Sequence, residues 1–281
     1  MYRLVASDMD ETFLARDHSI PAENLRAVRS METNGIEFVP ASGRGFDSIM
    51  MTLAPLVDAG LVPEYVISYN GGCITHVPDE EVVYSRTMPL ELAEEAFELS
   101  RELKMLFHVY VLNGPVWLHD MNESERRFLE GRMLVSEFEG NDLGFLKGQP
   151  IAKCLIQSDD FERLHEVGDT LDELGHGRLA SETEVVYSSD RYIEFCPKGV
   201  DKGSGLARLA DLLDIPMDET IGCGDSFNDL TLIQDAGLGV GTAGVTPDVR
   251  PSCDYVCAAD CDEGIMGEVF ERFLAPDHPR A

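Results

Sequence analysis

Apolar runs of strand length alternate with amphipathic segments in the N-terminal part of the chain. The runs at residues 2–7, 36–41 and 65–69 have the length of buried strands, and the segments at 21–35 and 47–56 carry apolar residues at helical spacing. Strands separated by helices favour parallel pairing. This part of the chain is therefore predicted to build an α/β sheet.

The pattern changes from about residue 83, where long amphipathic segments are followed by the alternation typical of hairpins. We expect helices at 89–106 and 161–174, and strands at 108–112, 116–118, 151–157, 185–187 and 192–195, with Asn113 and Gly114 in the turn of the first hairpin. Helices followed by hairpins indicate an α+β domain, which we place at residues 83–190.

The alternation of helices and strands returns after Gly199. Helices are predicted at 202–213 and 227–236, and strands at 220–223, 238–241 and 255–257. The chain is thus predicted to have a Rossmann-like α/β core with a parallel sheet, formed by residues 1–82 and 191–281 and interrupted by the inserted α+β domain.

Acidic residues outnumber basic ones by 52 to 22 in this 281-residue chain, which gives a formal net charge of −30. Such a surface repels nucleic acids and anionic membranes, so neither is an expected partner. No apolar run reaches the ~18 residues that span a bilayer, and no leader-like segment opens the chain. The seven cysteines are an odd number and are expected to stay reduced. We predict a cytoplasmic protein whose anion sites supply their own positive charge.

The first predicted strand runs into Asp8-Met9-Asp10-Glu11-Thr12. Ligands of open α/β sheets bind outside the carboxyl ends of the strands, where Asp8 and Asp10 can converge. Two close carboxylates repel each other unless a cation neutralises them, and Mg²⁺ suits their hard oxygens. One carboxylate can then act as a nucleophile and the other as a general acid. The alternative is a solvated acidic loop.

Two further segments bring groups that can bind an anion. Ser42 and Gly43 follow the second predicted strand, where a hydroxyl and a flexible backbone can donate hydrogen bonds to a phosphate, and Arg44 adds positive charge. Lys202 opens a predicted helix, where its charge opposes the helix dipole, so it indicates a task such as neutralising an anion. The alternatives are a helix-capping serine and a surface lysine.

The fourth segment, Gly222-Cys-Gly-Asp-Ser-Phe-Asn-Asp229, joins an apolar strand to a helix. It supplies the carboxylates of Asp225 and Asp229 and the amide of Asn228 at a strand end, although a capping aspartate would look the same. The four segments occur in a fixed order, each at a strand end or a helix start. Their conjunction is more specific than any one of them.

In these segments the chain resembles the phosphatases of the haloacid dehalogenase superfamily, and in particular the Cof-type subgroup with a large α+β (C2B-type) cap. The resemblance covers essentially the whole chain and includes Asn70-Gly71 and the run Gly199-Val-Asp-Lys-Gly. It implies a magnesium-dependent phosphomonoester hydrolase that acts on a small phosphorylated metabolite, with a sugar phosphate as the first choice. The inserted domain would then be a cap that sets specificity.

The resemblance also implies the part of each site residue. Asp8 would attack phosphorus, and Asp10 would serve as general acid and then as general base. Ser42, Gly43 and Lys202 would bind the phosphoryl oxygens, and Arg44 and Asn70 would contact the substrate. Mg²⁺ would bind to the side chains of Asp8 and Asp225 and to the backbone carbonyl of Asp10. Asn228 and Asp229 would support the metal or Lys202.

One residue departs from the pattern of the family, because Glu11 stands where glycine is common. A glutamate allows the loop if its φ stays negative, and it adds charge near the metal; we expect its side chain to point away from the site. Two other functions stay open, a phosphomutase of the same superfamily and a non-catalytic module that binds phosphosugars. Release of free phosphate without a bisphosphate activator would separate hydrolysis from the first. Against the second stand Asp8, Asp10, Lys202 and Asp225 together, because binding alone would not require the acid at Asp10. A monomer or a weak homodimer is expected.

Overall fold

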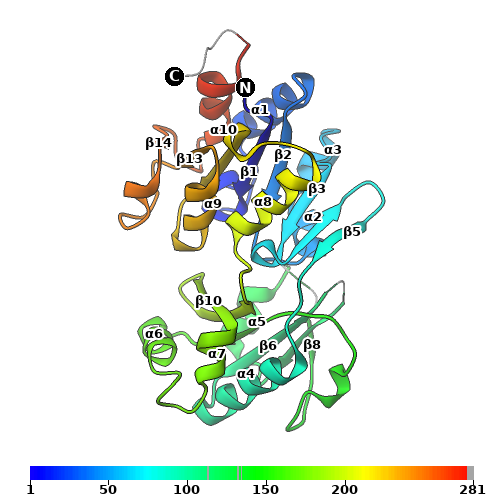
Figure 1. Ribbon diagram of the computed structural model, residues 1–281, viewed down its shortest axis with the longest axis vertical. Helices are drawn as coiled ribbons and strands as arrows, with labels where there is room; N and C mark the ends of the chain where they lie inside the picture. The colour runs from blue at the N-terminus through cyan, green and yellow to red at the C-terminus, as the bar shows by residue number, and fades with distance from the viewer. Residues whose placement is uncertain (113, 132, 134, 277–281) are drawn as a thin grey trace. The chain divides into compact units, whose positions relative to one another are not determined.

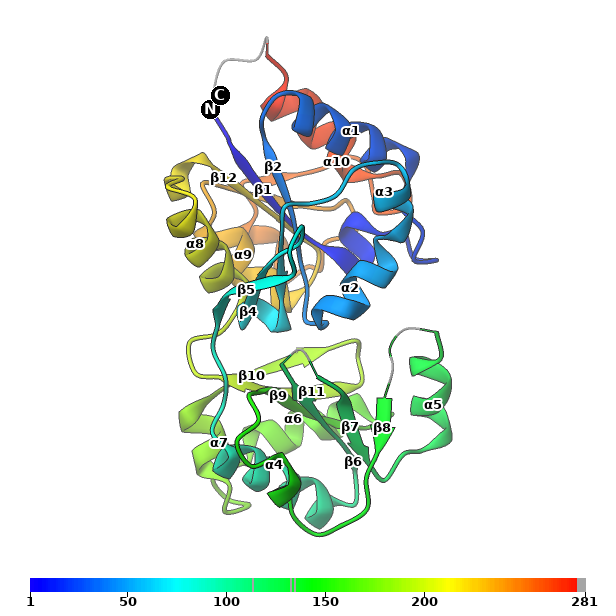
Figure 2. The same ribbon diagram turned by 90° about the vertical axis from the view of Figure 1, so that its right-hand side faces the viewer.

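The computed structural model describes residues 1–112, 114–131, 133 and 135–276, and it divides the chain into two compact units. Unit 1 comprises Met1–Tyr84 and Asp201–Ala281, and unit 2 comprises Ser85–Val200. Both are drawn in Figures 1 and 2. Among the residues described, no helix is both long and apolar enough to cross a membrane.

Unit 1 is built on a sheet with the strand order β14-β13-β12-β1-β2-β3-β4-β5. From β14 to β3 the neighbouring strands pair in parallel, and β4 then turns back antiparallel to β3. The predicted α/β core with a parallel sheet is confirmed. The strands are β1 (Leu4–Asp8), β2 (Glu37–Ala41), β3 (Tyr65–Ser68), β4 (Cys73–His76), β5 (Glu81–Ser85), β12 (Thr220–Gly224), β13 (Leu238–Gly241) and β14 (Tyr255–Val256).

Helices cover both faces of this sheet, with α1 and α10 on one side and α8 and α9 on the other (Figure 2). Successive side chains of β1 point to opposite faces, so Val5 packs in the first core whereas Leu4 and Ala6 pack in the second. The helices of unit 1 are α1 (Ala22–Thr33), α2 (Phe46–Thr52), α3 (Ala54–Asp58), α8 (Lys202–Leu212), α9 (Leu230–Asp235) and α10 (Ile265–Val269). Shorter turns are η1 (Met9–Phe13), η2 (Tyr69–Gly71), η4 (Met217–Glu219), η5 (Phe227–Asp229), η6 (Arg250–Ser252) and η7 (Phe270–Leu274).

Unit 2 has a sheet of its own, in the order β10-β11-β9-β6-β7-β8. One apolar core joins the sheet to the helices α4, α6 and α7, with Phe97 and Phe107 near its centre. The strands are β6 (Leu106–Val111), β7 (Val116–His119), β8 (Val135–Glu137), β9 (Ile151–Gln157), β10 (Thr183–Ser188) and β11 (Tyr192–Pro197). The helices are α4 (Leu90–Leu103), α5 (Glu123–Leu129), α6 (Phe161–Asp169) and α7 (Gly177–Glu182), with the short turn η3 (Gly144–Leu146).

The second boundary between the units differs from the predicted one. We placed it after residue 190, but it follows Val200, because β11 pairs with β10 and β9 along its length and belongs to unit 2. The helix expected at 47–56 is divided at Leu53, before Pro55, and the helix expected to reach residue 174 ends at Asp169. The hairpin of β6 and β7 is present, but Asn113 of its predicted turn lies outside the described residues.

Candidate active site

The register of the parallel strands brings the predicted residues to one edge of the sheet in unit 1. Asp8, the last residue of β1, is opposite Ala41 of β2, so Ser42 follows directly beside it. On the other side of β1, Ser7 is opposite Cys223 of β12, and Asp225 comes two residues later. The carboxyl ends of these three strands therefore bring Asp8, Ser42 and Asp225 to one edge of the sheet, where the sequence analysis expects a site.

The carboxylate of Asp8 is buried beside a lysine from a distant part of the chain. Lys202 Nζ lies 2.5 Å from Asp8 Oδ1 and 2.5 Å from Asp229 Oδ1, and only 1% of Lys202 is exposed. Burial alone would lower the pKa of Lys202, but the charges of Asp229 and Asp8 outweigh it and raise that pKa above its ordinary value. Lys202 is therefore a charged group that links two carboxylates.

The start of α8 fixes the position of Lys202. The side chain of Asp201 accepts a hydrogen bond from Ser204 N at 2.7 Å, and Asp201 N donates to Ser204 Oγ at 3.0 Å, which is a capping box. The same turn packs on η2, where a Cβ on Gly71 would lie 2.1 Å from Asp201 O. Gly71 also has a φ of 96°, so only glycine suits this close approach.

Asp229 uses both of its oxygens to hold its surroundings. Oδ1 accepts from Lys202, and Oδ2 accepts from the backbone N–H groups of Asp225 at 3.0 Å and Ser226 at 3.2 Å. Asn228 belongs to the same loop, since its Oδ1 accepts from Ser226 Oγ at 2.7 Å. The carboxylate of Asp229 therefore shapes the loop after β12 and orients Lys202.

Asp225 completes a cluster of three carboxylates. Its Oδ1 accepts from Thr12 Oγ1 at 2.8 Å, and carboxylate oxygens of Asp8, Asp225 and Asp229 lie within 4.8 Å of one another. Burial and the charge of Asp229 raise the pKa of Asp225 to about 7, and the same two causes raise the pKa of Asp8 well above its ordinary value. Three carboxylates meet one ammonium group, so the ionised cluster carries excess negative charge where burial disfavours it.

This cluster has the donor chemistry of a magnesium site. Carboxylate oxygens are the hard ligands that Mg²⁺ prefers, and a divalent cation would balance the excess negative charge. Asp229 is already engaged by Lys202 and two backbone N–H groups. Asp8 and Asp225 are therefore the side chains that fit the metal best.

Asp10 has a different set of partners. Its side chain is 42% exposed, and its Oδ1 accepts from Arg44 Nη2 and lies 3.3 Å from His18 Nδ1. Arg44 Nη1 in turn donates to Thr52 Oγ1 at 3.0 Å, so the guanidinium is held between α2 and Asp10. The structure thus places Arg44, which we predicted as a substrate contact, in an ion pair with the predicted general acid.

The turn after β2 and the loop after β3 pack as one piece. Ser42 is 3% exposed, its Oγ accepts from Arg44 N at 3.2 Å, and its carbonyl accepts from Asn70 N at 2.9 Å. A Cβ on Gly43 would lie 2.8 Å from Asn70 Oδ1, so the absence of a side chain at Gly43 leaves room for Asn70. Ser42, Gly43 and Asn70 therefore lie together next to the end of β1.

The condition of a negative φ at Glu11 is not met, because its φ is 57°. The chain reverses within η1, where Leu14 N donates to Met9 O at 2.8 Å, and the residue at the bend takes the left-handed conformation. The side chain of Glu11 is 63% exposed, and its Oε2 lies 4.0 Å from Arg16 Nε. Its charge nevertheless contributes to the raised pKa of Asp225.

The sequence analysis gave no role to two residues that contact the predicted site, Thr12 and His18. Thr12 is fully buried and donates to Asp225. The sequence feature that could have identified Thr12 is its place at the end of the first acidic segment, Asp8 to Thr12. His18 carries no comparable signal, because its contact with Asp10 depends on a turn whose shape the sequence does not show.

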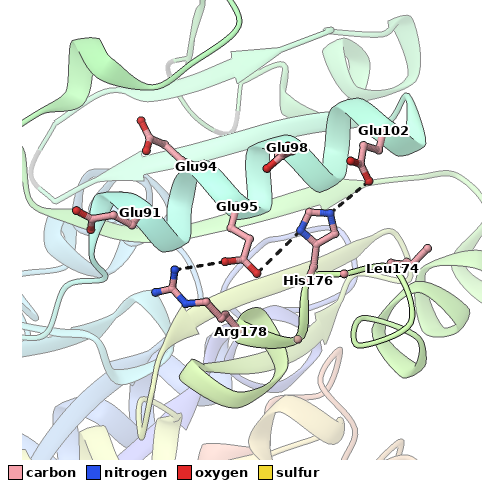
Figure 3. A pocket seen from close by; sticks show the side chains of 10 residues that line it. Glu91, Glu94, Glu95, Glu98, Glu102, Leu174, His176 and Arg178 are labelled. Carbon is pink, nitrogen blue, oxygen red and sulfur yellow. Dashed lines mark hydrogen bonds and ion pairs between the residues drawn. The ribbon is translucent and has the colours of Figure 1, made fainter.

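A pocket in unit 2 has a chemistry that does not suit a phosphoryl group. It has a volume of about 740 Å³ and is lined by five glutamates of α4 together with His176 and Arg178 (Figure 3). Arg178 Nη1 lies 3.7 Å from Glu95 Oε2, and His176 Nε2 lies 3.3 Å from Glu102 Oε2. Both basic side chains of the pocket are therefore already paired with carboxylates. None of the predicted site residues lines this pocket.

A Rossmann-like sheet with aspartates and a serine at its strand ends, and a lysine at the start of a neighbouring helix, is typical of the class of phosphotransfer hydrolases. The family of haloacid dehalogenase-like hydrolases matches residues 5–269 of this chain. The chain belongs to that family, and it is a phosphatase of the haloacid dehalogenase superfamily, as the sequence analysis predicts.

Relatives of this chain match over nearly their full lengths. Phosphatase YwpJ of Bacillus subtilis (strain 168) is 28% identical over 94% of this chain and 97% of its own length. The HMP-PP phosphatase of Yersinia enterocolitica is 25% identical over 99% and 97%. Among solved structures, a haloacid dehalogenase-like hydrolase from Bacteroides thetaiotaomicron has a TM-score of 0.79 and 28% identity, and the match covers 96% of this chain and 99% of that one.

Proposed function

We propose that this protein is a magnesium-dependent phosphomonoester hydrolase that forms an aspartyl phosphate on Asp8. The observation that carries the proposal is the buried Lys202, which lies 2.5 Å from both Asp8 and Asp229 beside the carboxylate of Asp225. Phosphoryl transfer requires a protein mainly to position the reactants and to cancel charge on the phosphoryl oxygens. Lys202 and Ser42 are the groups of this site that can do so.

In the first step, Asp8 Oδ would attack phosphorus while the bond from phosphorus to the leaving oxygen breaks. The carboxylic acid of Asp10 gives its proton to the leaving oxygen, so an alcohol departs and Asp10 becomes a carboxylate. Lys202 is hydrogen-bonded to Asp8 and can therefore reach the transferred phosphoryl group. The Ser42 hydroxyl and the backbone N–H of Gly43 can donate hydrogen bonds to the oxygens of that group. Bound Mg²⁺ would supply charge that offsets the repulsion between Asp8 and an anionic substrate.

In the second step, the Asp10 carboxylate takes a proton from water as the water oxygen attacks phosphorus. The bond between phosphorus and Asp8 breaks, which releases inorganic phosphate and restores the Asp8 carboxylate. Asp10 ends as a carboxylic acid, ready for the next cycle. Water attack at this step distinguishes the proposed hydrolysis from a phosphomutase, in which a second sugar hydroxyl would attack.

The substrate class we propose is a small phosphorylated metabolite, with sugar phosphates first. Alkoxides of sugars are strongly basic leaving groups, and a general acid such as Asp10 is needed for them more than for acidic phenols. One full-length relative is named as an HMP-PP phosphatase, which supports a small phosphorylated substrate in this family.

The proposal is tested by phosphate release from a panel of sugar phosphates and p-nitrophenyl phosphate, in Mg²⁺ and in EDTA. We expect turnover that requires the metal and that falls at least ~10³-fold in Asp8→Asn, since the amide is a poor nucleophile. Asp211→Asn is the matched control, because the Asp211 side chain is 75% exposed and pairs only with Arg208 among the residues described. Equal activity of wild type and Asp8→Asn would refute the aspartyl-phosphate mechanism.

A further inference from the structure

We propose that His18 is a positioning residue that, together with Arg44, holds the carboxyl group of Asp10 in the orientation for proton transfer. The inference rests on the proposed function, in which Asp10 protonates the leaving group. It assigns to His18 an effect that depends on the leaving group of the substrate.

The two basic side chains meet the same oxygen of Asp10. Arg44 Nη2 donates to Oδ1, and His18 Nδ1 lies 3.3 Å from that oxygen, within reach of a donor. A neutral imidazole with its proton on Nδ1 can make this contact, so no charge on the ring is required. In the proposed arrangement, Arg44 and His18 both donate to Oδ1, which would fix the side chain of Asp10 and leave Oδ2 to carry the transferable proton.

A tight turn directs His18 toward Asp10. His18 N donates to Ala15 O at 2.8 Å, Ala15 N donates to Ser19 O at 2.9 Å, and Ser19 N donates to Asp17 Oδ1 at 2.9 Å. His18 closes the turn in the left-handed region, with a φ of 64°. That conformation is unfavourable for most residues with a Cβ, so the turn holds the histidine at some cost in conformational energy.

The turn is anchored to a second segment of unit 1 by Arg16. Arg16 N donates to Asp262 Oδ1 at 2.9 Å, Arg16 Nη2 donates to Asp260 Oδ2 at 2.9 Å, and the guanidinium also pairs with Asp262. Three connections from one residue restrict the turn that carries His18. On the other side of Asp10, Thr52 fixes Arg44 in the same manner. Asp10 is thus held between two supported bases.

A surface ion pair without a role in the reaction is the alternative, since the side chains of His18 and Asp10 are each 42% exposed and such pairs contribute little to stability. The leaving group separates the two explanations. A sugar alkoxide needs a proton in order to depart, whereas p-nitrophenolate is a stable anion that departs without one. A positioning defect at Asp10 must therefore affect the first substrate more than the second.

The experiment compares His18→Gly with His18→Asn. Both residues accept a left-handed backbone, but only asparagine retains a donor, because its Nδ2 is bonded to Cγ as Nδ1 is in histidine. We expect His18→Gly to lower kcat/KM about 10-fold for the best sugar phosphate of the panel and less than about 2-fold for p-nitrophenyl phosphate. His18→Asn should restore most of the loss. The ratio kcat/KM is measured because it reports the step in which the leaving group departs.

Equal losses on both substrates, no loss on either, or a failure of His18→Asn to restore activity would each overturn the inference. If His18→Gly does not fold, His18→Asn is compared with His18→Leu, which lacks the donor, by the same ratio of substrates. Failure of the proposed function looks different, because wild type and Asp8→Asn would then not differ. Normal wild-type turnover with equal losses in His18→Gly removes only the role of His18.

Discussion

Each unit of the molecule buries a lysine against carboxylates, but the balance of charge differs. In unit 1, Lys202 contacts Asp8 and Asp229, and Asp225 lies in the same cluster. In unit 2, Lys153 pairs with Glu194 alone among the carboxylates described, and both residues are 3% exposed. The first group has an excess of negative charge, whereas the second is neutral.

The other buried carboxylate of unit 2 is also matched by donors. Glu125 accepts from Tyr192 OH at 2.6 Å and from Arg191 Nη2 at 2.9 Å, and His108 Nε2 lies 3.1 Å from it. Arg191 places a positive charge beside this carboxylate, and the same Nη2 also lies 3.4 Å from Oδ1 of the exposed Asp159. Removing one partner of a buried ionic group that is matched in this way is strongly destabilising, although apolar side chains of similar size can replace the whole group.

The difference between the units teaches where chemistry is to be expected. A matched pair gains little electrostatic free energy from a further ion. The electrostatic free energy of an unmatched cluster becomes more favourable when a cation binds, alone or together with an anionic substrate. In unit 1, burial and then the charge of Asp229 raise the pKa of Asp8 and of Asp225. Perturbed pKa values at a strand edge favour a functional site over a structural one.

The largest effects are expected when the buried lysine of each unit is replaced by methionine, and they test the difference in charge balance between the units. Lys202→Met should lower kcat/KM for the proposed reaction at least ~10²-fold, because it removes the charge that faces the phosphoryl oxygens. Both Lys202→Met and Lys153→Met should lower the free energy of unfolding by roughly 3–5 kcal/mol, since each leaves buried carboxylates without their cation. Enzyme assays and urea denaturation measure the two effects.

A compensating second substitution then distinguishes the units. Lys153→Met with Glu194→Leu should recover most of the lost stability, because a buried ion pair can be replaced by apolar side chains of similar size. Lys202→Met with Asp229→Leu should not recover it, because Asp8 and Asp225 remain. Equal recovery in the two double variants would contradict the difference in charge balance.

The pH dependence of stability should have opposite signs in the two units. The folded-state pKa of Asp225 is raised to about 7 from 3.8, so without metal its contribution is complete below about pH 4 and is lost as the pH rises through about 7. We expect a loss on the order of 4 kcal/mol over that range in EDTA, by urea denaturation. Asp225→Asn should flatten this slope.

His108 supplies the contrast in unit 2. Burial lowers the pKa of His108 below 6.5 despite the neighbouring Glu125, so its contribution is present above pH 6.5 and is lost as the pH falls below it. His108→Gln should therefore reduce the loss of stability in acid and leave the slope between pH 7 and higher values unchanged. The explanation is wrong if Asp225→Asn and His108→Gln change the slope of stability against pH with the same sign.

The sequence predicted the sheet of unit 1 and most of the candidate site, because both depend on local patterns. Asp8, Ser42, Lys202 and Asp225 each adjoin a predicted strand or helix end, and parallel strands bring such ends to one edge. Their positions at strand and helix ends were therefore enough to predict that these four residues lie close together.

Contacts that depend on the three-dimensional path of turns could not be predicted. Arg44 reaches Asp10 because α2 begins just after it, and His18 reaches Asp10 through a turn closed by backbone hydrogen bonds. The boundary after Val200 was missed for a similar reason, since the pairing of β11 with β9 joins strands far apart in the sequence. Sequence patterns identify elements, but pairing decides which unit an element joins.

The smallest expected effect concerns Glu11, which has a left-handed backbone conformation. Its φ of 57° is unfavourable for a residue with a Cβ by ~1–2 kcal/mol, whereas glycine accepts it but loses more backbone entropy on folding, ~0.5–1 kcal/mol. Glu11→Gly should therefore raise the free energy of unfolding by about 0.5–1 kcal/mol. The change also removes one of the charges that raise the pKa of Asp225, so the metal-free pH slope should shift slightly toward lower pH. Glu11→Ala, which keeps the Cβ, separates the two causes: it should shift the slope in the same way without any gain in stability from relief of the left-handed backbone.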